Sequence, residues 1–158
     1  MSDNMAPAME CVVERIFDAP AETIWQMWTD SEHFKKWYGP QGFTIPVAQI
    51  DAQVGGKRLV CMSSPDGSKK MWSTGEHMEL TPHTRLVYTE SPSDENGNVI
   101  SPQAMGMPEG FPTVTTVTVE LEEVDGKTKM VLIHAGVPEQ AAGGWGQAFA
   151  KLADYLAG

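Results

Sequence analysis

The last stretch of the chain, Glu139 to Leu156, constrains the fold most, because its pattern predicts one amphipathic helix. Its apolar side chains fall four, three and four residues apart, the spacing that aligns one face of an α-helix. They are Trp145, Phe149, Leu152 and Leu156, with Gln147, Lys151 and Asp154 on a wet opposite side. Such a helix must bury its apolar stripe. The only large partner that the sequence offers is the set of strand-like segments before it.

Seven of these segments are predicted to be strands, because they are rich in β-branched and aromatic residues and are bounded by turn residues. They are Glu10 to Phe17, Phe43 to Asp51, Lys57 to Ser63, Lys70 to Leu80, Thr84 to Glu90, Thr113 to Val124 and Lys127 to Gly136. Asp125-Gly126 joins the last two and is the strongest hairpin signal in the chain. Consecutive strands at hairpin spacing indicate an antiparallel sheet.

Two short helices are predicted between the first two strands. Pro20 suits the first turn of one, which ends near Thr29, and the acidic start Asp30-Ser31-Glu32 suits the other, which ends at Gly39-Pro40. The fold class is therefore α+β, in the order β-α-α-β-β-β-β-β-β-α. A curved sheet that closes on one long helix commonly encloses an internal cavity.

Composition places the chain among globular proteins and excludes some partners. With 158 residues, 41% hydrophobic and 20% charged, it fits a single domain over residues 10–158, preceded by a flexible leader, Met1 to Met9. The net charge of −10 argues against nucleic acid and against an anionic membrane surface. No apolar run is long enough to span a membrane.

The sequence also gives expectations for the cellular location of the protein, the state of its cysteines and its oligomeric state. The leader lacks the basic and apolar regions of a secretory signal, so we expect a cytoplasmic protein. Cys11 and Cys61 lie in apolar strand segments and are predicted to be buried thiols, although a disulfide between them stays open. Exposed edge strands make a homodimer a further possibility.

Residues 91–112 break the strand pattern with four prolines and three glycines. We expect a long loop without regular structure, which compact domains rarely carry without a use. Met105, Met107 and Phe111 would be exposed there unless they fold over a site. Two interpretations stay open: a lid over a cavity, and a disordered surface insertion.

Several short motifs, taken in order, resemble the START-like helix-grip superfamily (SRPBCC), and within it the branch named after the activator of the heat-shock-protein-90 ATPase. The motifs are Arg15-Ile16-Phe17-Asp18-Ala19-Pro20 with Ile24-Trp25, Trp28-Thr29-Asp30, Trp37-Tyr38-Gly39-Pro40, Gly55-Gly56-Lys57, Pro65-Asp66-Gly67, Gly75 and Gly144-Trp145-Gly146-Gln147. The resemblance covers roughly Glu10 to Leu156. It implies a strand, two short helices, six strands and a long helix around a hydrophobic cavity.

The resemblance is compatible with three functions. Members of the superfamily include lipid and hormone binders, polyketide cyclases and a eukaryotic co-chaperone domain. We expect binding of a small hydrophobic or amphipathic molecule between the sheet and the last helix. The alternatives are an enzyme of the cyclase or hydratase type, and a co-chaperone-like domain with a chaperone partner. We expect no counterpart here of the additional N-terminal domain that the co-chaperone carries.

The candidate ligand-binding residues are aromatic, methionine and histidine side chains on the predicted helices, strands and loop. They are Trp28, Trp37, Met62, Trp72, Met78, Tyr88, Met105, Phe111, His134, Trp145 and Phe149. Ten methionines suit an adaptable apolar surface. The alternative for each aromatic residue is plain core packing, because aromatic side chains dominate protein cores.

No catalytic residue, metal or cofactor is predicted. The four histidines show no metal-ligand spacing, and no phosphate loop, nucleophile elbow or dinucleotide fingerprint is present. An enzyme would need His77 and His134 to meet across the sheet as acid and base, with Glu76, Glu79 or Tyr88 nearby. Arg15 and Arg58 could bind a ligand carboxylate, or form ion pairs with carboxylates of the chain.

Overall fold

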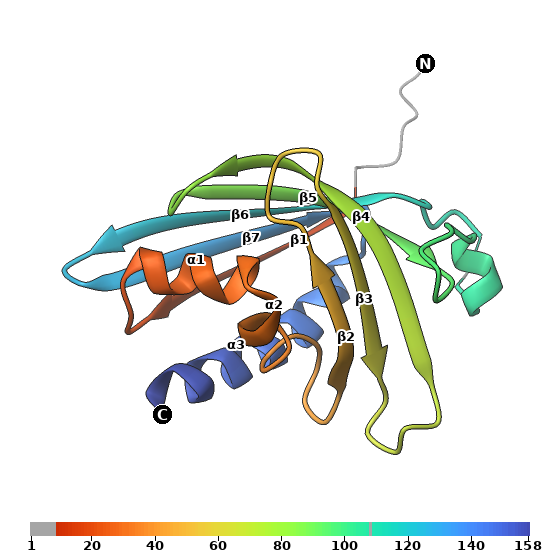
Figure 1. Cartoon of the computed structure of the whole chain (residues 1–158), viewed down its shortest axis with the longest axis horizontal. Coiled ribbons are helices and arrows are strands. Elements are labelled where there is room, and N and C mark those ends of the chain that lie inside the picture. Colours follow the sequence, from red (N-terminus) through yellow and green to blue (C-terminus); the bar gives the residue numbers. More distant parts are fainter. Residues whose placement is uncertain (1–8, 108) are drawn as a thin grey trace.

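One curved antiparallel sheet of seven strands forms the frame of the protein in a computed structural model that describes residues 9–107 and 109–158 (Figure 1). Its strands are β1 (Glu10–Phe17), β2 (Thr44–Ile50), β3 (Lys57–Ser63), β4 (Lys70–Thr81), β5 (Arg85–Ser93), β6 (Thr115–Val124) and β7 (Lys127–Ala135). They are ordered β1-β7-β6-β5-β4-β3-β2. The predicted α+β fold and strand order along the chain are confirmed.

The helices lie under the curve of the sheet (Figure 1). They are α1 (Ala21–Thr29), α2 (Ser31–Phe34) and α3 (Ala142–Ala157), with short 3₁₀ turns η1 (Pro102–Met105) and η2 (Glu139–Ala141). The carboxylate of Asp30 accepts hydrogen bonds from the backbone of Glu32 and His33, so it caps α2. Because α1 and α2 connect the edge strands β1 and β2, they close the open side of the sheet.

The second helix is shorter than predicted. It ends at Phe34, and Trp37 and Tyr38 lie in the turn that follows, before Gly39 adopts a φ of 90°. Lys151 of α3 holds this turn, because its Nζ donates to the carbonyl oxygens of Tyr38, Pro40 and Phe43 at 3.2, 3.1 and 3.3 Å. Lys151, expected on a wet side, therefore packs α3 against the turn.

The segment predicted to be irregular, residues 91–112, carries some regular structure. Strand β5 continues to Ser93, which forms an isolated bridge with Val99. Ser101 caps η1 by accepting a hydrogen bond from the backbone of Ala104. The predicted leader lies outside the described residues except for Met9.

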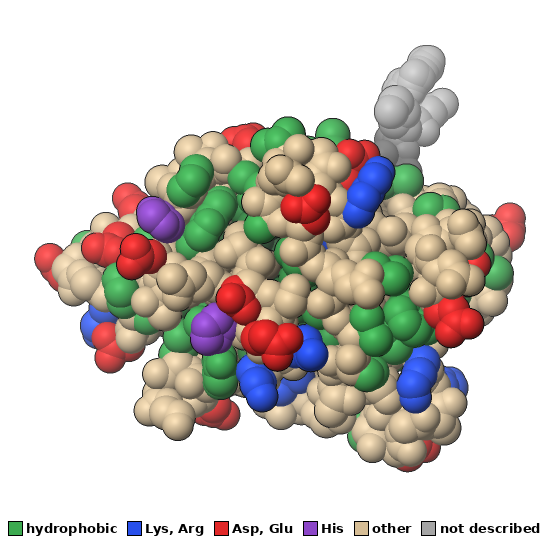
Figure 2. Space-filling view, in the orientation of Figure 1, with side chains coloured by type: hydrophobic (Ala, Val, Ile, Leu, Met, Phe, Trp, Pro, Cys, Tyr) green, Lys and Arg blue, Asp and Glu red, His purple; other side chains and the backbone are tan. Residues whose placement is uncertain are grey.

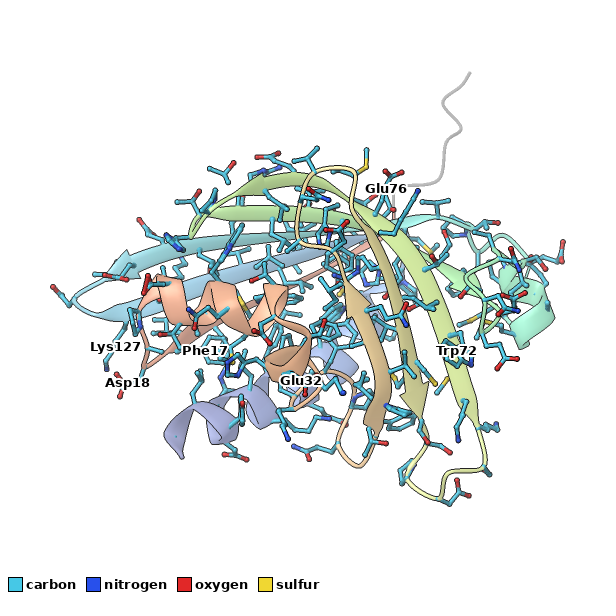
Figure 3. The ribbon with its side chains drawn as sticks, viewed as in Figure 1. Phe17, Asp18, Glu32, Trp72, Glu76 and Lys127 are labelled. Atoms are coloured by element: carbon cyan, nitrogen blue, oxygen red, sulfur yellow. The ribbon has the colours of Figure 1, made fainter. Side chains whose placement is uncertain are left out.

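Side chains fill the middle of the molecule between the sheet and α3. Phe17, Trp28, Trp37, Phe149 and Leu152 are each at most 2% exposed. The indole N–H groups of both tryptophans are bonded, one to the sulfur of Met130 and the other to the carbonyl of Met27. Phe17 marks this filled end in Figure 3, and Trp72 marks the opposite end. A pocket of about 340 Å³ borders Phe17, Ala153 and Leu156 at this end, and the other space between the sheet and α3 lies toward Trp72.

The two cysteines remain thiols. Cys11 lies on the edge strand β1 and Cys61 on β3, at nearly opposite sides of the sheet, which is too far for a disulfide. Burial raises the pKa of both thiols above the usual value, as expected for structural cysteines.

Candidate functional site: an apolar cleft

An apolar cleft lies at the end of the sheet where α3 begins. It has two parts, with volumes of about 270 and 330 Å³. Both parts share four lining residues: Tyr38, Met62, Glu90 and His134. We treat the two parts as one cleft on the basis of these shared walls.

The smaller part lies against the first turns of α3. Ala141, Gly144 and Ala148 line it, together with the ring of Trp145 and the turn at Pro40. These helix residues leave room because their side chains are small. The apolar stripe of α3 thus has two functions: Phe149 and Leu152 fill the core, and the N-terminal turns border open space.

The larger part lies between the sheet and the segment that carries η1. Its apolar walls come largely from strands β3 to β5 and from residues 102–107 and 111–112. The apolar lining residues are Val60, Met62, Met71, Trp72, Pro92, Pro102, Met105, Met107, Phe111, Pro112 and Val137. Figure 2 shows hydrophobic side chains gathered over β4 on the face turned to the viewer. Four methionines in one lining give a surface that can adapt to differently shaped ligands.

A directed chain of hydrogen bonds runs along one wall. Trp145 Nε1–H donates to Nδ1 of His134 at 3.1 Å, and Nε2 of His134 lies 3.0 Å from Oγ1 of Thr115. Since Nδ1 accepts, the proton is on Nε2, which donates to Thr115; Thr115 in turn donates to the carbonyl of Glu90 at 3.3 Å. Burial lowers the pKa of His134, partly opposed by Glu90, which favours the neutral ring that this chain requires.

Behind the cleft, Tyr38 and Tyr88 join their hydroxyl groups at 2.8 Å. Burial raises the pKa of both phenols, so both stay protonated. Arg58 lies beyond them, 3% exposed, with its guanidinium carbon 3.6 Å from the centre of the Tyr88 ring. Its partner across β4 is Gly75, which has no side chain to stop Arg58 from reaching over the strand to β5. Arg58 lines neither part of the cleft.

Six of the predicted ligand-binding residues line the cleft: Met62, Trp72, Met105, Phe111, His134 and Trp145. Four others lie in the filled core, namely Trp28, Trp37, Tyr88 and Phe149. Met78 lies elsewhere, 54% exposed on the outer face. The reason is strand alternation, because the preceding residue His77 points inward and the pairing shifts at this bulge.

The predicted meeting of His77 and His134 does not occur. The two residues share one row across the sheet, but Tyr88 and Val117 stand between them. Three interstrand spacings of about 4.8 Å therefore separate them along the sheet. Burial and the nearby Arg58 lower the pKa of His77, and neither ring nitrogen has a hydrogen-bond partner of normal geometry among the described residues. An acid–base pair of these two histidines is thus ruled out.

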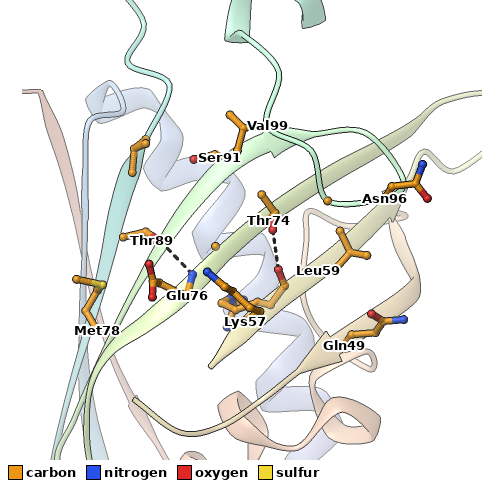
Figure 4. Close-up of a pocket in the computed structure, with 14 residues that line it drawn as sticks. Gln49, Lys57, Leu59, Thr74, Glu76, Met78, Thr89, Ser91, Asn96 and Val99 are labelled. Atoms are coloured by element: carbon orange, nitrogen blue, oxygen red, sulfur yellow. Dashed lines mark hydrogen bonds between the residues drawn. The ribbon is translucent and has the colours of Figure 1, made fainter. Parts of the chain in front are cut away.

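A second hollow, about 620 Å³, lies on the outer face of the sheet (Figure 4). Its walls mix apolar side chains with many polar ones, which are Gln49, Lys57, Thr74, Glu76, Thr89 and Asn96. Two of these groups already bind within the wall, because Thr74 donates to the carbonyl of Arg58 and Thr89 accepts from the backbone of Glu76. The groove therefore suits an apolar ligand less well than the cleft.

Sequence reasoning missed two residues that line both parts of the cleft as site residues, Tyr38 and Glu90. Tyr38 belongs to one of the motifs that resemble the family, Trp37-Tyr38-Gly39-Pro40, and this motif could have indicated Tyr38 as a site residue. Glu90 ends a predicted strand and resembles any exposed acidic strand end. Its position becomes informative only when α3 and β7 bring Trp145 and His134 beside it.

Two further structural features bear on the site. Within the described residues, no group of three or more His, Cys, Asp or Glu side chains could hold a metal ion. In the same part of the chain, no helix is both long and apolar enough to cross a membrane.

Comparison with known proteins gives a family and a set of related structures. The family model described as "Activator of Hsp90 ATPase homolog 1-like protein" matches residues 18–157. A search of curated proteins gives no match.

The related structures share the fold at low identity. A protein from Chromobacterium violaceum is 24% identical with a TM-score of 0.77, covering 92% of this chain and 95% of that chain. A protein from Mycobacterium smegmatis is 20% identical with a TM-score of 0.76, covering 96% of both. The AHSA1 protein from Silicibacter pomeroyi is 19% identical with a TM-score of 0.73, covering 94% and 97%.

Proposed function

Since the chain belongs to the family of activator-of-Hsp90-ATPase-like proteins, whose fold is known for ligand binding, we propose that it binds a small hydrophobic or amphipathic molecule in the cleft at the start of α3. The observation that carries the proposal is the cleft itself. Apolar side chains from the sheet, α3 and residues 102–107 and 111–112 border two adjoining spaces that share four lining residues, at the end where the core leaves the sheet uncovered.

The arrangement supports binding rather than catalysis. The polar groups that line the wall are largely used in contacts within the protein, as in the chain from Trp145 through His134 to Thr115. The methionine-rich wall offers apolar area without a reactive group. A ligand that covers this surface gains about 25 cal/mol for each Å² of apolar area removed from water.

A pair of neighbouring glycines on α3 allows a direct test. Gly144 lines the cleft, and a Cβ there would contact Pro40 at 3.7 Å, whereas Gly143 is exposed with nothing within 4 Å of an added Cβ. Gly144→Met should fill the smaller part of the cleft and weaken binding of 1-octanol about tenfold, while Gly143→Met should leave it unchanged. NMR titration that follows the indole Nε1–H of Trp145 would measure both. Equal affinities in the two variants, or no binding of 1-octanol to the natural protein, would contradict the proposal.

A further inference from the structure

Glu90 is the one charged side chain among the described residues that line the cleft. Neither part has a lysine or arginine in its wall, and Glu90 borders both. It lies on the inner face of β5, directly opposite Thr115 of β6. A carboxylate in a mostly apolar wall is costly unless a partner compensates its charge.

The described residues supply no such partner. No described residue donates a hydrogen bond to the Glu90 carboxylate or forms an ion pair with it; the contact with Thr115 uses the backbone carbonyl. The neighbouring polar groups are committed elsewhere: Tyr38 to Tyr88, and both nitrogens of His134 to Trp145 and Thr115. The acceptor capacity of Glu90 is therefore left for a bound molecule.

Aromatic rings stand around the same part of the cleft at steep angles. The rings of Tyr38 and Trp145 are 5.5 Å apart at 85°, and those of His134 and Trp145 are 5.8 Å apart at 77°. Ring faces carry partial negative charge and attract cations, and such aromatic walls bind ammonium groups in other proteins. The aromatic rings and the Glu90 carboxylate therefore both favour a positively charged ligand.

We propose that the ligand is an amphipathic amine. Its ammonium group binds in the smaller part, against Glu90 and the faces of Tyr38 and Trp145. Its apolar tail runs along the larger part, past Met62, Met105 and Phe111. This inference rests on the proposed function and narrows it to one class of ligand.

The charge of the whole protein acts in the same direction. The net charge of −10 raises the local concentration of cations and disfavours anionic amphiphiles such as fatty acids. The buried cation Arg58 does not reverse this preference, because it is stacked behind Tyr88 and is not part of the cleft wall.

The test compares three eight-carbon ligands with different head groups: octylammonium, 1-octanol and octanoate, each titrated calorimetrically at pH 7 below its micelle concentration. The natural protein should bind octylammonium about ten times more tightly than 1-octanol, as a charge-assisted contact predicts, and octanoate more weakly than 1-octanol. Glu90→Gln keeps the shape of the side chain and should reduce the preference for octylammonium to about threefold or less. Glu122→Gln, on the exposed end of β6, removes the same charge and should keep the full preference.

The outcomes separate this inference from the proposed function. Binding of 1-octanol as tight as that of octylammonium by the natural protein would overturn the amine assignment and leave apolar binding intact; this comparison needs no variant to fold. An equal loss of the preference for octylammonium in Glu90→Gln and Glu122→Gln would also overturn the amine assignment, because the preference would then come from the long-range charge of the protein and not from a contact with Glu90. No binding of any of the three compounds would overturn both.

Discussion

Trp145 of α3 donates its indole Nε1–H to Nδ1 of His134 on β7, at 3.1 Å. This contact connects the start of the last helix to the sheet, beside the cleft. It requires an unprotonated Nδ1, because a protonated ring has no acceptor. Protonation of His134 would therefore break one of the contacts that hold α3 beside the cleft.

We predict that the free energy of unfolding falls as the pH is lowered from 7.5 to 5.5. Burial lowers the pKa of His134 below its ordinary value, about 6.5, and Glu90 only partly opposes this shift. Above that value both states are neutral, and below it the unfolded chain takes up a proton that the native ring resists. Stability is thus lost by at most about 1.4 kcal/mol per pH unit for each such histidine. Urea unfolding at several pH values measures the slope.

Variants separate the contribution of His134 from that of other groups. His134→Gln should flatten the slope but leave a remainder due to His77, whose pKa burial also lowers. His83→Gln, on an exposed turn, serves as the control. Asp66 acts outside this range, because hydrogen bonds from Ser68 and Ser64 lower its pKa to about 2. An unchanged slope in His134→Gln would contradict the prediction.

Gly75→Ala should destabilise the protein by about 3 kcal/mol or more, because overpacking against backbone cannot relax through a flexible side chain. An added Cβ would lie 1.8 Å from the carbonyl oxygen of Thr89 on β5. Gly146→Ala is the matched control, since nothing lies within 4 Å of its added Cβ in α3. Loss of a helix-interior glycine should stabilise by about 1 kcal/mol. Thermal unfolding of both variants measures these changes. A shift of the Tm in the same direction for Gly75→Ala and Gly146→Ala would contradict the prediction.

The fold was largely predictable because its signals are local. The Asp125-Gly126 turn shows this: its φ angles are 53° and 80°, as a tight hairpin requires, and the strands on either side are those predicted. Strand ends were less accurate. Residues Ser91 to Ser93 continue β5 although Pro92 lies among them, because long-range pairing with β4 overrides local propensity.

Arg58→Met should change the free energy of unfolding by less than about 1 kcal/mol or raise it. Neither terminal guanidinium nitrogen of Arg58 has a hydrogen-bond partner among the described residues, and only the rings of Tyr88 and Phe34 compensate the buried charge. A methionine of similar length removes the desolvation cost and keeps the packing. Arg58→Ala should instead lose about 2 kcal/mol or more, since it leaves a cavity. A large loss in the methionine variant, measured by urea unfolding, would show that the guanidinium is paired in solution.

The site was less predictable than the fold, because its composition depends on which aromatic residues the core uses. Trp28 and Trp37 carry the same sequence signal as Trp145, yet α1 and the turn after α2 place them in the core, near the ring of Phe149. The prediction for Met78 was wrong because the strand pairing shifts at a β-bulge there, and no residue type in the sequence predicts that bulge. Glu90 can be identified as a site residue only from its neighbours on other elements, so the residues next to it in the sequence do not predict its place in the cleft.

Lys151→Met should lower the free energy of unfolding by about 2 kcal/mol and weaken ligand binding at the same time. The Nζ of Lys151 donates to three carbonyl oxygens in residues 38–43, and each would lose a charge-assisted hydrogen bond. Tyr38 and Pro40 belong to that turn and also line the cleft, so the loss should move a wall of the site. Lys36→Met removes the same charge from an exposed position. Urea unfolding and 1-octanol titration of both variants would test this link, and equal behaviour of the two would show that the turn holds its place without Lys151.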